Sequence, residues 1–206
     1  MADIPEAGRD PRAVIREAVE NWALWRDSGR WRELRALYTA DAVVHTTWFV
    51  GAASEFVGRC MESAGRGARS QHFLGAVSVE LAGGRAVAES RAMLMVRAPL
   101  HGVEVDVTCW LRFYDWFVRE AAGWRIRMRS GVYEKDRIDS VDPSIKISLD
   151  PAALASYPEG YRHLAYLQAA GGARITPDLP TPGSDALARL YAEGRRWLAQ
   201  EAWPWK

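Results

Sequence analysis

The sequence predicts an α+β fold in which helices come first and a mostly antiparallel sheet follows. Before residue 40, apolar residues recur at helical spacing. From His72 onward they alternate with polar residues, as in strands with one buried face. Between two alternating runs, Gly83-Gly84 is typical of a two-residue hairpin turn and indicates antiparallel pairing.

The N-terminal part is expected to form a pair of helices. Asp10-Pro11 has the residue types of a helix N-cap and first helical position, and the apolar stripe behind it ends near Ser28-Gly29. A second stripe begins at Trp31 and predicts a helix that stops before Asp41. Next, residues 42–50 are rich in Val, Thr and aromatic residues and predict a strand, and residues 54–64 return to helical spacing.

Further strands are expected over residues 72–81, 86–97, 103–114 and 124–129. The run 103–114 alternates over twelve positions and predicts a long strand with two distinct faces. Residues 136–206 are rich in proline and lack this alternation, but helices are expected over 161–170 and 184–201, with Ser184 as a cap. We therefore expect a domain over residues 1–135 and a helical C-terminal extension over residues 136–206, packed on that domain or on a neighbouring subunit.

Composition excludes several classes of partner. Lys+Arg 27 against Asp+Glu 26 leaves a net charge of +1, which favours neither nucleic acid nor an anionic membrane. No run reaches the roughly 20 apolar residues of a membrane span, and the charged start of the chain, residues 1–12, does not resemble a signal peptide. The two cysteines and four histidines lack metal-ligand spacing, and no glycine loop suggests a phosphate or cofactor. We expect a cytoplasmic protein without metal or cofactor that binds a small apolar or aromatic organic molecule.

His72 is the candidate for chemistry. It lies between polar residues and Phe73-Leu74 at the start of a strand, where partial desolvation would keep its imidazole neutral and able to accept a proton. Asp27 is a candidate partner for this ring. From spacing alone, the alternatives are that His72 is an ordinary core or surface histidine and that Asp27 is a solvated residue at a helix end.

Three segments carry a resemblance to a known family: WRDSGRWREL (residues 25–34), SEFVG (54–58) and SQHFLG (70–75). Over about residues 12–133 the chain resembles the scytalone dehydratases and, more broadly, the SnoaL-like branch of the nuclear transport factor 2-like superfamily. The resemblance implies a cone, in which a curved, mostly antiparallel sheet wraps the N-terminal helices and holds an apolar ligand in its mouth. In the dehydratases and the similar dehydrochlorinase of lindane degradation, an aspartate orients a catalytic histidine, and these positions fall on Asp27 and His72.

The resemblance also implies that several pocket residues of the dehydratases are replaced in this chain. Two dehydratase tyrosines would fall near Thr46 and on Arg26, a second histidine near Val96, and a serine and an asparagine on Thr108 and Trp110. These differences argue against scytalone as the substrate. The carboxylate of the ketosteroid isomerases would also fall near Thr46, so its absence argues against that chemistry.

Strand alternation extends the expected substrate-binding residues. If Thr108 faces the cup, Asp106 and Trp110 face it too, and Asp106 would need a cationic partner. The candidate partners are Arg91, Arg125, Arg127 and Arg129, although alternating arginines also fit a solvated stripe. The expected substrate-binding residues are Thr46, Phe49, Asp106, Thr108, Trp110 and Tyr133. Trp48 is a further pocket candidate, whereas His45 is expected to point away because Thr46 and Trp48 take the alternate side.

These observations favour a cofactor-independent lyase of the dehydratase or dehydrohalogenase type. His72, oriented by Asp27, would remove a proton from a small, largely apolar cyclic substrate, and Thr108 or a tyrosine hydroxyl would stabilise the oxyanion. Two alternatives remain open at this point: a non-catalytic small-molecule binding protein, and an isomerase or polyketide cyclase with the same base. We also expect a homo-oligomer, a dimer or trimer, for which the apolar face of residues 103–113 is a candidate contact.

Overall fold

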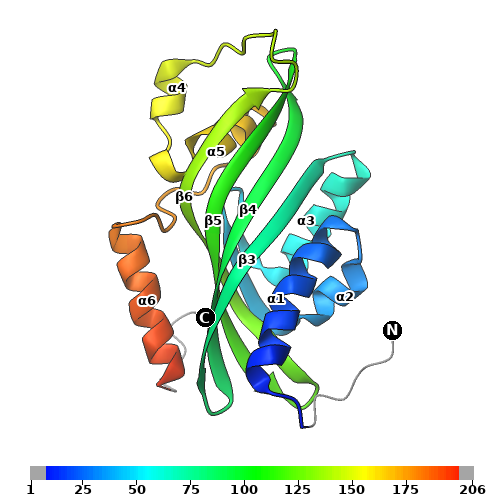
Figure 1. Ribbon diagram of the computed structural model, residues 1–206, viewed down its shortest axis with the longest axis vertical. Coiled ribbons are helices and arrows are strands. Elements are labelled where there is room, and N and C mark those ends of the chain that lie inside the picture. Colours follow the sequence, from blue (N-terminus) through cyan, green and yellow to red (C-terminus); the bar gives the residue numbers. More distant parts are fainter. Residues whose placement is uncertain (1–7, 200–206) are drawn as a thin grey trace.

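A computed structural model describes residues 8–199 of the chain (Figure 1). Residues 1–7, part of the N-terminal segment considered above, and residues 200–206, which include the expected end of the last helix, lie outside the described residues. The helices are α1 Pro11–Asp27, α2 Trp31–Ala36, α3 Ala53–Gly65, α4 Pro151–Ala155, the 3-10 helix η1 Glu159–Tyr161, α5 Arg162–Ala170 and α6 Asp185–Leu198. The strands are β1 Tyr38–Thr46, β2 Phe49–Ala52, β3 Arg69–Ala82, β4 Arg85–Leu100, β5 Val103–Glu120 and β6 Gly123–Ser140.

The strands form one curved sheet that does not close on itself. Their order is β2-β1-β6-β5-β4-β3, and only β1 and β6 pair in parallel. Figure 1 shows α1, α2 and α3 together on one side of the long strands, while α6 lies on the other side. The predicted α+β class, with a mostly antiparallel sheet around N-terminal helices, is confirmed.

Helix α1 begins and ends where its sequence predicts. The Asp10 side chain accepts a hydrogen bond from the backbone N of Arg12, and Pro11 occupies the first turn. The chain leaves the helix through Gly29, whose φ of +73° favours glycine. Asp27 is the last residue of α1 and is therefore fixed at a helix end beside the sheet.

Three predicted boundaries are corrected by strand pairing. The second helix ends at Ala36, because the Leu37 carbonyl accepts from the backbone N of Ile126 and Tyr38 already pairs in β1. The predicted strand 42–50 is two strands, since the chain turns at Thr47-Trp48. Strand β6 continues to Ser140, because β5 is long enough to pair with it along its whole length.

A bulge in β6 explains why the alternating arginines do not form one solvated stripe. Phe117 pairs with Ile126 and Trp116 with Met128, so Arg127 is an extra residue and the faces exchange there. Beyond it Met128 packs on the outer side, and Arg129 points inward with a side chain only 1% exposed. Arg125 instead donates to the backbone carbonyls of Trp124 and Ala122, and Arg127 pairs with Asp41.

The C-terminal extension packs on both faces of the sheet. Helices α4 and α5 lie at the upper end of the long strands in Figure 1, where α5 packs on β5 and β6 with buried residues in the inner core, whereas α6 covers the outer face. Ser184 caps α6 as predicted by accepting from the backbone N of Leu187. On the outer face the Trp197 ring stacks on Trp116, with ring centroids 5.7 Å apart.

The apolar face of residues 103–113 is not an available contact surface. Val105, Val107 and Cys109 are completely buried in the core beneath the helices. The expected subunit contact through this face is therefore corrected, because the helices inside the curved sheet already cover it. Within residues 8–199, no helix has both the length and the apolarity needed to cross a membrane.

Candidate functional site

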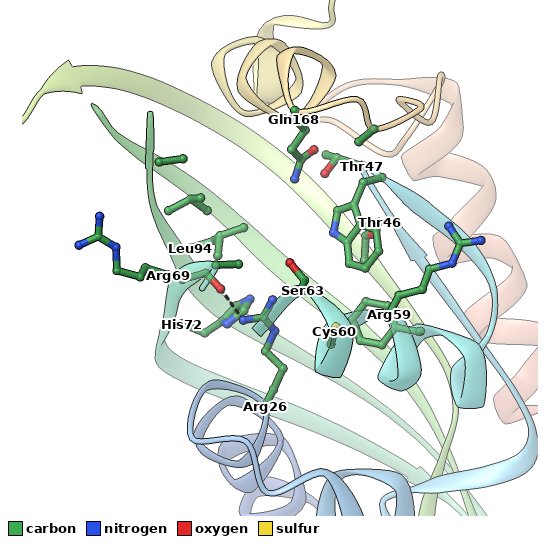
Figure 2. Close-up of a pocket in the computed structure, with 18 of the residues that line it drawn as sticks. Arg26, Thr46, Thr47, Arg59, Cys60, Ser63, Arg69, His72, Leu94 and Gln168 are labelled. Atoms are coloured by element: carbon green, nitrogen blue, oxygen red, sulfur yellow. Dashed lines mark hydrogen bonds between the residues drawn. The ribbon is translucent and has the colours of Figure 1, made fainter. Parts of the chain in front are cut away.

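A cavity of about 850 Å³ opens between the inner face of the sheet, α3 and α5 (Figure 2). This volume suits a small organic molecule. Its walls combine aromatic and aliphatic side chains with a few polar groups, among them the predicted residues Thr46, His72 and Tyr133 and the pocket candidate Trp48.

His72 and Asp27 are in direct contact at one end of this cavity. The ring Nδ1 of His72 lies 2.9 Å from Oδ1 of Asp27, and the backbone N of His72 donates to Oδ2 at 2.5 Å. The carboxylate thus accepts from the ring and from the backbone of the same residue. This geometry assigns the ring proton to Nδ1 and leaves Nε2 as the nitrogen with the free electron pair. The His72 side chain is 6% exposed. The Trp22 ring packs edge-on against the imidazole, with ring centroids 5.2 Å apart.

Burial lowers the pKa of His72, and the charges of Arg26 and Arg129 lower it further, so that together they outweigh the hydrogen bond and charge of Asp27. Burial raises the pKa of Asp27, but the hydrogen bonds from the His72 ring and backbone, together with the charges beside the carboxylate, outweigh this effect and hold the pKa below its usual value. At neutral pH the pair is therefore a carboxylate beside a neutral imidazole.

Arg26 stands next to this pair and lines the cavity, as Figure 2 shows. One guanidinium nitrogen donates to the Ser70 hydroxyl and to Oδ1 of Asp27, the latter at 3.2 Å. Burial raises the pKa of the Cys60 thiol, and the nearby Arg26 guanidinium opposes this rise through its charge and a hydrogen bond. From the sequence, Arg26 stood out only as a position where the chain differs from the dehydratases. Its position directly before Asp27 is the sequence feature that could have identified it as a site residue.

The arginines around the cavity are largely neutralised by carboxylates. Four of the five have an acidic partner: Arg26 with Asp27, Arg59 with Glu55, Arg69 with Glu104 and Arg97 with Asp106. The fifth is Arg66. The cavity therefore carries little net charge, which favours an uncharged ligand.

A buried ion pair supports the aromatic residues behind His72. Nε and Nη2 of Arg129 donate to the two oxygens of Asp115 at 2.7 and 2.6 Å, and both side chains are at most 1% exposed. The guanidinium also lies over the rings of Trp22 and Phe113, 4.0 and 4.4 Å from their centroids. Asp115 was missed, although it continues the alternation of residues 103–113 by one step onto the same inner face.

Tyr133 and Thr46 line the cavity away from His72. The Tyr133 ring crosses Gly131, where an added Cβ would stand 2.7 Å from the ring, so only glycine leaves room for it. The Tyr133 hydroxyl accepts from the backbone N of Thr47 at 3.3 Å, and burial raises the pKa of Tyr133, so it keeps a proton to donate. The Thr46 hydroxyl donates to the Phe49 carbonyl at 3.3 Å.

The remaining predicted residues do not line the cavity. Phe49 is buried in the core and contacts the Trp48 and Phe56 rings, which do line it. Asp106, Thr108 and Trp110 lie on the outer face of β5, since Val105, Val107 and Cys109 take the inner face. Their expected placement in the cup is corrected for this reason.

On that outer face Asp106 pairs with Arg97, which was not among the partners expected from the sequence, and Trp110 lies under the Lys135 ammonium group. The predicted direction of His45 agrees with the structure, because it lies outside this cavity, against the segment before α6.

Residues 10–130 match the SnoaL-like domain. The chain belongs to the SnoaL-like family. Two curated relatives from Fusarium vanettenii, a PEP2-like protein and pea pathogenicity protein 2, are each 30% identical over 201 residues, covering 92% of this chain and 86% of theirs. An uncharacterised protein of Emericella nidulans is 31% identical over 204 residues, covering 91% of this chain and 85% of its own. These relatives align with the C-terminal extension as well as with the domain.

Solved structures with this SnoaL-like fold include two proteins named for elimination reactions. A hexachlorocyclohexane dehydrochlorinase (LinA type 2) superposes with a TM-score of 0.56 at 10% identity, over 68% of this chain and 94% of that one. A protein of Novosphingobium aromaticivorans described as a scytalone dehydratase superposes with a TM-score of 0.52 at 17% identity, over 68% and 99%. At these identities the likeness shows the fold, and the expected SnoaL-like membership is confirmed by the match over residues 10–130.

Proposed function

We propose that this SnoaL-like protein is a cofactor-independent lyase in which His72 removes a proton from a small, largely apolar cyclic substrate. The observation that carries the proposal is the contact between His72 Nδ1 and Asp27, made by a buried ring at the wall of a mostly apolar cavity. The names of the two structural neighbours, a dehydrochlorinase and a dehydratase, agree with this reaction class.

The first step is proton transfer to Nε2 of His72. Asp27 holds the other ring nitrogen as the donor, so the free electron pair of Nε2 is available to the substrate. The imidazolium that forms is then stabilised by the adjacent carboxylate, which needs no reorganisation at that moment.

The second step is loss of the leaving group. The electron pair left by the proton forms a double bond to the next carbon as hydroxide or halide departs from it, and the proton on His72 is available to the departing hydroxyl. Arg26, beside His72, stabilises the negative charge that develops on the substrate carbonyl oxygen. Thr108 is not part of this step, because it lies on the outer face of β5.

The test uses two cyclic ketones with the native protein. In D₂O, 1-tetralone is followed by NMR for deuterium at C2, and 3-hydroxy-1-tetralone is followed by absorbance for 1-naphthol, which forms when the C2 proton and C3 hydroxyl leave as water. We expect both exchange and naphthol formation, faster than in buffer alone.

The other results would contradict the lyase assignment in different ways. Exchange without naphthol would indicate an isomerase or cyclase that returns the proton. Binding of 1-naphthol without either reaction would indicate a protein that holds its ligand unchanged.

The pH dependence of this reaction follows from the lowered pKa of His72. Only the neutral ring is a base, so kcat/KM for 3-hydroxy-1-tetralone is expected to fall on acidification only below the ordinary histidine value of 6.5. Because the Arg26 charge contributes to the lowering, Arg26→Gln is expected to move this acidic limb to higher pH. If kcat/KM of the native protein already fell on acidification above pH 6.5, the assignment of His72 as the base would be contradicted.

A further inference from the structure

Gln168 contributes an unused polar group to the end of the cavity formed by α5. Its side chain lines the cavity, and its Oε1 is buried with no hydrogen-bond partner among residues 8–199. A buried acceptor without a donor costs about 1–3 kcal/mol. The oxygen points toward Thr47 in Figure 2, so a ligand in the cavity reaches it when the amide rotates; a donor on the ligand then removes the penalty and gains affinity by doing so.

The cavity has polar groups at two separate ends. Figure 2 shows Gln168 reaching from α5 toward Thr47, while His72 and Arg26 lie together at the opposite end. Apolar side chains form much of the remaining cavity wall, including Trp48, Phe56, Leu94 and Leu111. A molecule that fills the cavity would therefore be apolar along its middle and polar at both ends.

Helix α5 is held firmly enough to place Gln168. The buried Asp136 carboxylate of β6 accepts from His163 Nδ1 and from the backbone N of Leu164, both at 2.7 Å. After α5, the backbone N of Thr176 donates to the Thr47 carbonyl at 2.8 Å. Leu164 itself is completely buried. A side chain carried by a fixed helix selects ligands better than one carried by a loose loop.

The segment that carries Gln168 lies beyond the part of the chain that matches the SnoaL-like domain, which ends at residue 130. The His72 end of the cavity comes from the shared domain, whereas the α5 end comes from the extension. The extension thus adds a recognition group to a cavity whose reactive pair the domain supplies.

We propose that Gln168 is a specificity-determining residue, which binds a hydroxyl group on the substrate at the end away from the proton that His72 removes. Only the position of the reacting proton rests on the proposed function. A hydroxyl fits the site because it donates to an amide oxygen and accepts from an amide nitrogen, so it is matched in either orientation of the amide. A carboxylate lacks the donor that Oε1 needs.

The test compares naphthols that differ by one hydroxyl group. Calorimetry measures the Kd of 1-naphthol and of 1,5-, 1,6- and 1,7-dihydroxynaphthalene, which carry a second hydroxyl on the far ring. The native protein is expected to bind at least one dihydroxy compound about 5- to 10-fold more tightly than 1-naphthol, as one added neutral hydrogen bond allows. Gln168→Met keeps the length of the side chain and is expected to lose this preference while binding 1-naphthol as before.

Gln71→Met is the matched control. Gln71 is exposed on β3 and does not line the cavity, so the preference should survive there. If Gln168→Met fails to bind 1-naphthol, Gln168→Ala is measured in its place with the same expectations.

A native protein without naphthol binding or without the preference, or a Gln168 variant that keeps the preference, would overturn the proposal. Because these measurements involve no proton transfer, failure of the elimination assay would leave them valid. The two proposals can thus fail separately.

Discussion

Replacing His72 by alanine is expected to reduce the turnover of 3-hydroxy-1-tetralone by about 10²- to 10⁴-fold, the contribution of a positioned general base. The substitution removes the imidazole that Asp27 orients and that accepts the proton in the proposed reaction. Steady-state formation of 1-naphthol measures the effect, and circular dichroism checks that the fold is intact.

Asp27→Asn is expected to reduce turnover nearly as much, by a different route. An amide can donate to Nδ1 and thereby favour the tautomer whose proton points into the cavity, which leaves no free electron pair for the substrate. His101→Asn is the control, because His101 is exposed in the turn before β5 and contacts Tyr166 instead of the cavity. A folded His72 or Asp27 variant with near-native turnover would show that the pair is not the base.

Replacing Asp115 by alanine is expected to lower the free energy of unfolding by about 3–5 kcal/mol, because it leaves the Arg129 charge buried and unpaired. Both side chains of this pair are at most 1% exposed, so water does not screen the charge that remains. Urea denaturation followed by tryptophan fluorescence measures the loss.

The matched control is Asp106→Asn. Asp106 also pairs with an arginine on a neighbouring strand, but the two side chains are 39% and 40% exposed. Loss of the Asp106–Arg97 ion pair should lower the free energy of unfolding by less than about 1 kcal/mol. Equal effects of the two substitutions would mean that burial does not set the strength of these pairs.

The order of helices and strands could be predicted from the sequence because it rests on local periodicity. Which side chains of β6 point to each face of the sheet could not be predicted in this way. The alternation of residues 124–129 reads as unbroken, and the extra residue at Arg127 becomes visible only when β6 pairs with β5. Tyr38 was misplaced for a related reason, since its apolar spacing fits a helix and only pairing with Ile126 assigns it to a strand.

The two ends of the cavity differ in how far the sequence could predict them. His72 and Asp27 are 45 positions apart, so local spacing gave no contact between them, and the family resemblance supplied it. The same resemblance placed Thr108 in the cup, but both faces of β5 carry large apolar residues and the alternation leaves its phase open. Gln168 could not be predicted, because helical periodicity indicates burial without telling which cavity a side chain enters.

The bulge at Arg127 links two regions on opposite faces of the sheet. Beyond it, Met128 and Val132 pack in the outer cluster with α6, while Arg129 lies inward against Trp22 and Tyr133 lines the cavity. Because both sets depend on the same extra residue, a one-residue deletion there would reverse them together, placing a methionine behind the His72 ring and a guanidinium against the tryptophans beneath α6. Strand β6 should therefore tolerate substitutions of its side chains better than insertions or deletions that change its length.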